Sequence, residues 1–222
     1  MRVITCYQGQ LQVAAAPAPS RAEAGVAGDL ALSHLERGYV HELLATDCMP
    51  RLVAAWLSAA LASADAVVWC EAAGEPYPPA LAAAGILPRR VYMVRPRTQA
   101  EAVWATTEAL RCRGVGATIA MPERLTAVEA RRLQLAAERG GGIGLLLRRL
   151  DGSPHAARTR WLVRPALGDP LTQRWRLRLI HGHGRPSDQD VLLEVNRETH
   201  HVRAADVVAD RSREATPTRT AG

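Results

Sequence analysis

Apolar runs and amphipathic stretches alternate through the middle of this chain. Short apolar runs predict strands at residues 39–44, 66–70, 90–95, 116–121 and 143–147. Between these runs, apolar residues recur every three or four positions, which predicts helices. This alternation is typical of a mostly parallel sheet with helices on both faces, joined by right-handed crossovers.

The first predicted helix has a clear start. Thr46-Asp47 can cap its N-terminus, and Pro50 lies in its first turn, where a missing N–H is tolerated. Its apolar face is expected to contain Leu52, Val53, Trp56, Leu57, Ala60 and Leu61.

The later helices have similar signals. A short alanine-rich helix is predicted after Pro78-Pro79, ending at Gly85. The helix over 98–112 is expected to bury Val103, Trp104, Thr107 and Leu110. The last helix begins with a capping box of Thr126 and Glu129 and stops at the glycines of 140–142.

After residue 155 polar and apolar residues alternate without intervening helices. The runs at 160–164, 174–180 and 189–195 are typical of antiparallel strands. We expect them to extend one edge of the sheet without a separate core. The folded domain is therefore predicted at 29–205, between a flexible arm rich in Ala, Pro and Gly at 1–28 and a polar, disordered tail at 206–222.

Composition excludes some chemistry. All 28 basic residues are arginine, because the 222-residue sequence contains no lysine. Mechanisms that need a lysine ammonium, such as a P-loop phosphate contact or a Schiff base, are therefore excluded. No G-x-S-x-G turn or paired acid motif occurs either, so we expect no catalytic residue and no cofactor. The net charge of +6 permits a polyanionic partner without requiring one.

The sequence also gives no sign of a metal or a membrane. The cysteines lack Cys-x-x-Cys spacing, which argues against zinc and against disulfides; they are Cys6, Cys48, Cys70 and Cys112. The histidines at 181, 183, 200 and 201 have no carboxylate or cysteine at ligand spacing. The apolar run at the N-terminus is too short for a signal peptide. Residues 52–70 are interpreted as a helix followed by a strand, and not as a membrane span. We expect a cytoplasmic protein.

Arginines form a stripe in the predicted antiparallel strands. On a strand they would point to one face, and the candidates are Arg160, Arg164, Arg174, Arg176 and Arg178. Such a stripe can follow a DNA backbone, or it can protect a sheet edge from aggregation, and both interpretations stay open. Trp161 and Trp175 have apolar neighbours, which favours core packing over base stacking.

Several local strings, in their common order, resemble the ImuA family of RecA/SulA-like proteins associated with translesion DNA synthesis. They span roughly residues 36–196 and are Arg37-Gly38-Tyr39-Val40-His41-Glu42-Leu43-Leu44, Tyr77-Pro78-Pro79-Ala80-Leu81, Glu108-Ala109-Leu110-Arg111-Cys112 with Val115-Gly116-Ala117, Arg131-Arg132-Leu133-Gln134-Leu135-Ala136-Ala137-Glu138, Thr159-Arg160-Trp161-Leu162-Val163 and Arg174-Trp175-Arg176-Leu177. The resemblance implies a RecA-like three-layer α/β domain with a mostly parallel central sheet and a C-terminal antiparallel extension.

The resemblance places a degenerate nucleotide loop after the first strand. An active RecA-like ATPase would have G-x-x-x-x-G-K-[ST] there, whereas this chain has Ala45-Thr46-Asp47-Cys48-Met49-Pro50-Arg51. Asp47 would repel phosphate, Pro50 removes an N–H donor, and Arg51 is expected to be a solvated helix residue. Glu71 follows the second predicted strand, where such ATPases place a water-activating glutamate; without phosphate and metal we expect a surface or helix-cap residue.

The resemblance implies a non-catalytic accessory or adaptor protein of SOS-induced translesion DNA synthesis, acting through protein–protein contacts. Its implied partners are an inactive polymerase homologue, ImuB, and an error-prone DNA polymerase. RecA, DNA and a second copy of the chain are further candidates. Two other hypotheses stay open: a DNA-binding module that uses the arginine stripe, and a SulA-like inhibitor of cell division.

Overall fold

The computed structural model describes residues 35–46, 50–61, 66–72, 76–84, 86–151, 154–182, 190–198 and 202–206. Their strands form one nine-stranded sheet in the order β3-β2-β4-β5-β1-β6-β7-β8-β9. The predicted arm at 1–28, and the predicted tail from 207 onward, lie outside the described residues.

The parallel part of the sheet consists of β1 (Val40–Ala45), β2 (Ala66–Cys70), β3 (Val91–Val94), β4 (Val115–Ala120), β5 (Ile143–Arg149) and β6 (Thr159–Asp169). Every neighbouring pair among these strands is parallel. The strands predicted from apolar runs are confirmed, and no end differs from the prediction by more than two residues.

The sheet continues with β7 (Thr172–Gly182), β8 (Asp190–Asn196) and β9 (Val202–Asp206), which are antiparallel to their neighbours. The predicted extension is confirmed, with two differences. β6 is parallel to β1 and antiparallel to β7, so the change of direction comes after β6. The sequence pattern predicts no strand at β9, because five residues carry too little alternation; β9 forms because β8 supplies partners for its backbone.

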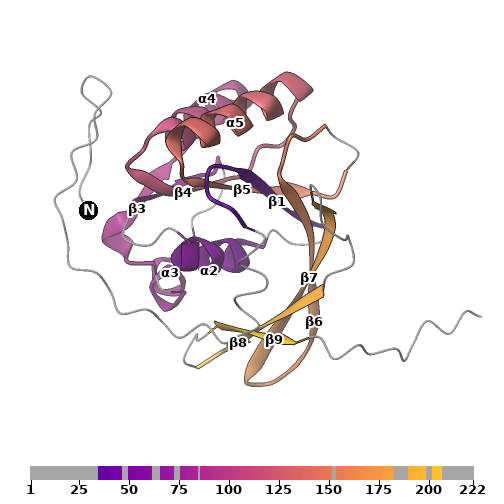
Figure 1. Cartoon of the computed structure of the whole chain (residues 1–222). Helices are drawn as coiled ribbons and strands as arrows, with labels where there is room; N and C mark the ends of the chain where they lie inside the picture. The colour runs from indigo at the N-terminus through magenta and orange to yellow at the C-terminus, as the bar shows by residue number, and fades with distance from the viewer. Residues whose placement is uncertain are drawn as a thin grey trace, which may run out of the picture.

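Helices cover both faces of the sheet (Figure 1). α2 (Arg51–Leu61) and α3 (Pro78–Ala83) lie on one face, and α4 (Gln99–Arg111) and α5 (Ala127–Gly140) lie on the other. A 3-10 turn at Pro88–Arg90 leads into β3. The predicted three layers are confirmed. Within the described ranges, no helix is both long and apolar enough to cross a membrane.

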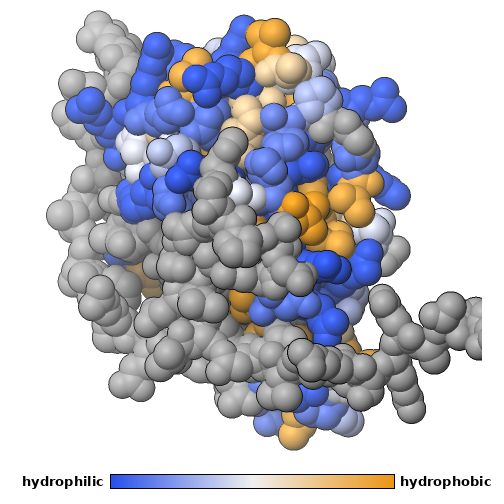
Figure 2. All heavy atoms as spheres, turned by 45° about the vertical axis from the view of Figure 1, so that its right-hand side comes forward, coloured by the Kyte–Doolittle hydropathy of each residue, from blue (hydrophilic) through white to orange (hydrophobic). Residues whose placement is uncertain are grey.

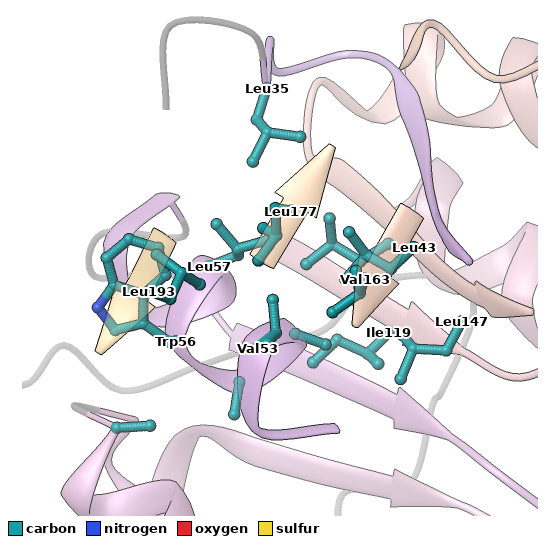
Figure 3. Close-up of a cluster of buried hydrophobic side chains, with 14 of the residues drawn as sticks. Leu35, Leu43, Val53, Trp56, Leu57, Ile119, Leu147, Val163, Leu177 and Leu193 are labelled. Atoms are coloured by element: carbon teal, nitrogen blue, oxygen red, sulfur yellow. The ribbon is translucent and has the colours of Figure 1, made fainter. Parts of the chain in front are cut away.

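The larger core lies between α2 and the sheet (Figure 3). Val53 and Leu57 of α2 lie close to Leu43 and Val163 of the sheet. Side chains of the antiparallel strands, including Leu193, belong to the same cluster. The extension therefore shares the core of the parallel sheet, as expected.

The second core lies under α4 and α5. It contains Val103 and Leu110 of α4 and Leu133 of α5. Trp104 was expected to face this core, and that prediction is wrong: its side chain is 66% exposed. Val103, Thr107 and Leu110 follow helical spacing along one side of α4, and Trp104 lies one position, about 100°, away from that line.

Glycine lets α5 end against α4. The capping box of Thr126 and Glu129 is present at the start of α5, and Gly141 ends the helix in the left-handed conformation, with φ of 75°. A Cβ atom on Gly140 would lie 1.9 Å from the carbonyl oxygen of Leu110. Gly140 is therefore required by the close contact between the C-terminal ends of the two helices.

Gly140→Ala is expected to lower the free energy of unfolding by about 1–3 kcal/mol, because the backbone of α4 must move. This loss should exceed the gain of about 1 kcal/mol that alanine brings inside a helix. Gly114→Ala is the matched control, since its Cβ would meet nothing within 4 Å. Urea unfolding measures both; equal midpoints for the two variants would contradict the contact.

Candidate functional site

The loop between β1 and α2 lies where a RecA-like ATPase would bind phosphate. α2 begins at Arg51, directly after Pro50, so the predicted order of strand, loop and helix is confirmed. Thr46 follows β1, whereas Asp47 and Cys48 lie outside the described residues. The loop sequence contains neither the glycines nor the lysine that a phosphate cradle uses.

Glu71 is buried at the end of β2, so the expectation of a surface or helix-cap residue is wrong. Its side chain is 3% exposed. Arg51 donates hydrogen bonds to Glu71 Oε1 from Nε, at 3.0 Å, and from Nη2. Trp69 donates from its indole Nε1 to Glu71 Oε2 at 3.0 Å. The carboxylate can be buried because a guanidinium from the start of α2 neutralises it. The two residues are 20 positions apart, so the sequence pattern did not predict this contact.

This geometry engages the carboxylate of Glu71 on both oxygens. A general base needs an oxygen that can reach a water or a substrate, and here the guanidinium and the indole take those positions. The hydrogen bond to Glu71 raises the pKa of Arg51 further above its ordinary value, so the guanidinium stays charged. Arg51 was expected to be solvated; its side chain is half-exposed and ties α2 to the end of β2.

The end of β4 lies beside this pair in the sheet and has no buried acid. The chain continues there as Met121-Pro122-Glu123, and Glu123 is exposed. Its backbone N–H donates to Gln99 Oε1 at 3.3 Å.

The arginines of the predicted stripe lie on the face of β6 and β7 that points away from α2, where Arg164, Arg176 and Arg178 are exposed and Arg160 and Arg174 are partly buried. They alternate with Trp175, Leu177 and Leu179, which are buried on the side facing α2. Arg164 stands directly opposite Arg176 in the antiparallel register. Trp161 is buried as well, which confirms core packing for both tryptophans of these strands.

Buried carboxylates neutralise part of the stripe. Arg160 donates from Nε to Glu42 Oε2 at 2.8 Å, and Arg174 donates from Nε to Glu194 Oε1 at 2.7 Å. These arginines are therefore held by the protein itself. Arg178 also has an interaction within the fold.

Glu42 is the centre of a buried ion cluster that the sequence prediction missed. Arg148 donates from Nη1 to Glu42 Oε1 at 2.8 Å, and both side chains are 1% exposed. One carboxylate of β1 thus serves Arg148 from β5 and Arg160 from β6. The available signal was a charged residue inside each of two apolar strands, because such a residue needs a buried partner.

The histidines show no metal site among the described residues. His181 lies on β7, where its ring contacts the ring of His155 edge-on at 4.8 Å between centroids. In the described ranges, no three His, Cys, Asp or Glu side chains are grouped to hold a metal ion. The histidines at 183, 200 and 201 lie outside those ranges.

The fold defines the class of protein: an α/β domain, mostly parallel with an antiparallel C-terminal extension, compatible with a RecA-like fold. Two curated relatives, each named Protein ImuA, come from the Caulobacter vibrioides strains NA1000 / CB15N and ATCC 19089 / CIP 103742 / CB 15. They are 35% identical to this chain over 137 residues, which is 54% of this chain and 56% of the relatives. The chain thus spans about half the length of the curated relatives it matches. The match confirms the resemblance and supports assignment of the chain to the ImuA family. No protein family model matches the chain.

Glu42→Gln is expected to lower the free energy of unfolding by about 3–5 kcal/mol, because it leaves two guanidiniums without their shared counter-charge in the interior. Glu36→Gln is the matched control. Glu36 pairs with Arg158 at 3.5 Å on a half-exposed surface, where a pair contributes about 0–1 kcal/mol. Equal losses in urea unfolding would show that the cluster does not stabilise the sheet.

Proposed function

We propose that this chain is a non-catalytic, RecA-like accessory protein of SOS-induced translesion DNA synthesis, which acts in the cytoplasm through contacts with other proteins. The ImuA-family assignment supports the association with translesion synthesis, since that is what the resemblance implies. The absence of catalysis is supported by the chain itself. The observation that carries it is the ion pair of Arg51 and Glu71 beside a loop without glycine or lysine.

The physical argument concerns charge at the start of α2. Phosphate binding there needs free backbone N–H groups and a cation that is not already neutralised. Pro50 contributes no N–H, and the guanidinium of Arg51 is bound by a buried carboxylate. A triphosphate would have to compete with Glu71 for Arg51, and it would find no lysine in the chain.

The partners follow from the same proposal. An ImuB-like inactive polymerase homologue and an error-prone DNA polymerase supply the chemistry, and this chain brings them together. RecA is a further candidate partner. The sheet and the helices packed on it offer surfaces for such an assembly, and binding needs no nucleotide cycle.

Mg²⁺ and ATP are expected to leave the midpoint of thermal unfolding unchanged, and the purified chain should show no ATP turnover. The measurement is sensitive, because ATP at one hundred times its dissociation constant would stabilise the fold by about 2.7 kcal/mol. Glu71→Gln is the matched variant and should show the same background level of ATP turnover as the parent chain. Mg²⁺-dependent turnover that is lost in Glu71→Gln would overturn the proposal.

Co-expression with an ImuB-like polymerase homologue is expected to yield a complex that survives size-exclusion chromatography. The complex should form without nucleotide. It should also persist in Glu71→Gln, because the proposed assembly does not depend on catalysis at Glu71. Failure of the two proteins to co-elute at micromolar concentration, while each is folded, would contradict the adaptor role.

A further inference from the structure

The β6–β7 hairpin projects beyond the strand that supports it. β1 pairs with β6 only as far as Leu162, and β6 then continues to Asp169. In the described part of the chain, the far edge of this segment has no strand beside it. Pro165 lies on that edge and lacks an N–H, which discourages pairing with another strand. The hairpin end forms the lowest part of the molecule in Figure 1.

Two arginines stand directly opposite each other on the solvent side of this hairpin. Arg164 and Arg176 are register partners, and both are exposed. Neither has an ion pair or hydrogen bond to another described residue, unlike Arg160 and Arg174. Like charges directly opposite each other on a sheet destabilise it. The pair therefore favours a ligand with closely spaced negative charges.

A third arginine lies at the same end. Arg197 is exposed, and its backbone N–H donates to the carbonyl oxygen of Leu171 at 2.8 Å. The nearby carboxylate of Asp169 serves the turn, because its Oδ1 accepts the backbone N–H of Leu171 at 2.9 Å. This hydrogen bond holds the pKa of Asp169 below its ordinary value.

The hairpin end also exposes apolar side chains. Leu167 is 94% exposed and Leu171 is 53% exposed. In Figure 2 hydrophobic atoms lie beside hydrophilic ones at the lower end of the molecule. Single exposed leucines are ordinary on a protein surface, but here two of them flank the turn of the hairpin that carries Arg164 and Arg176.

We propose that this hairpin end, with Arg164, Arg176, Leu167 and Leu171, binds single-stranded nucleic acid. The paired guanidiniums can hold neighbouring phosphates, because directly opposite Cβ atoms on a sheet lie about 5 Å apart and guanidinium matches phosphate geometry. The leucines supply an apolar surface or wedge for bases, as apolar side chains do in other nucleic-acid complexes. A polyanion suits this site better than an isolated carboxylate, which would neutralise only one of the two arginines. The contact goes beyond the proposed adaptor function and does not depend on it.

The test is fluorescence anisotropy of a labelled oligothymidylate with the full chain at several salt concentrations. Arg164→Glu together with Arg176→Glu should weaken binding at least tenfold and reduce the dependence of log K on log salt by about 1.4, at about 0.7 per lost phosphate contact. The matched control is Arg131→Glu with Arg132→Glu on α5, which changes the net charge equally at two exposed positions. The control should weaken binding less than threefold. Equal losses in the two double variants would overturn the site.

The leucines have a separate readout. Leu167→Ser with Leu171→Ser should weaken oligothymidylate binding severalfold and leave the salt dependence unchanged, because no charge is lost. Urea unfolding of every variant should match the parent chain. Arg164→Gln with Arg176→Gln is a second double variant of the arginines, which removes their charge without reversing it. No loss of binding in a folded Arg164→Gln, Arg176→Gln variant would overturn the proposal.

Two further outcomes separate this site from the adaptor role. Co-elution with the polymerase-like protein should persist in the Arg164→Glu, Arg176→Glu variant, which would assign the hairpin to nucleic acid. Loss of that co-elution, with no oligothymidylate binding by the parent chain, would make the hairpin a protein contact and overturn the nucleic-acid assignment. Failure of the adaptor role alone would leave the anisotropy result unchanged.

Discussion

The carboxylate of Glu42 joins β5 to β6, the strand from which the antiparallel extension continues. It lies on β1, the strand between β5 and β6, and it accepts hydrogen bonds from Arg148 on one side and Arg160 on the other. Arg148 also donates from Nη1 to the carbonyl oxygen of Pro154 at 3.3 Å, which ties down the connection that leads into β6. A buried charge is tolerated only with its partners in place, so this cluster fixes how the strands pack around β1.

The position of β6 then decides which face of the antiparallel strands packs on the core and which face points away from it. Their apolar residues share the core under α2, so one face of the extension is closed. The alternation of a strand places the arginines on the other face. Glu42 and Glu194 neutralise two of them from within the fold. The charge that is left for a ligand is concentrated at the end of the hairpin.

The ion pair of Arg51 and Glu71 is a second internal contact that neutralises a buried carboxylate. It joins Arg51 at the start of α2 to Glu71 at the end of β2. In this chain the contact lies beside the loop at which RecA-like ATPases bind phosphate. The proposed adaptor role and the proposed hairpin contact both rely on the surfaces of the domain.

Local pattern was enough to determine most elements of this fold. The apolar run at β2 and the capping box at Thr126 act through neighbouring residues, so their structure follows from the sequence nearby. The absence of lysine is likewise a property of the sequence alone and rules out lysine chemistry. Trp104 shows the limit of such patterns, because large apolar residues on a helix need not lie on its buried side.

Only the tertiary structure decided which charges are free. Glu71 lies 20 residues from Arg51, and Glu42 lies 106 residues from Arg148 and 118 from Arg160, so no local pattern pairs them. The same holds for β9, which becomes a strand because β8 offers its backbone a partner. Hydrophobic periodicity acts over a few residues, whereas the burial of a charge depends on what the fold brings beside it. That is why the sequence could place the arginines on one face but could not tell which of them are available to bind.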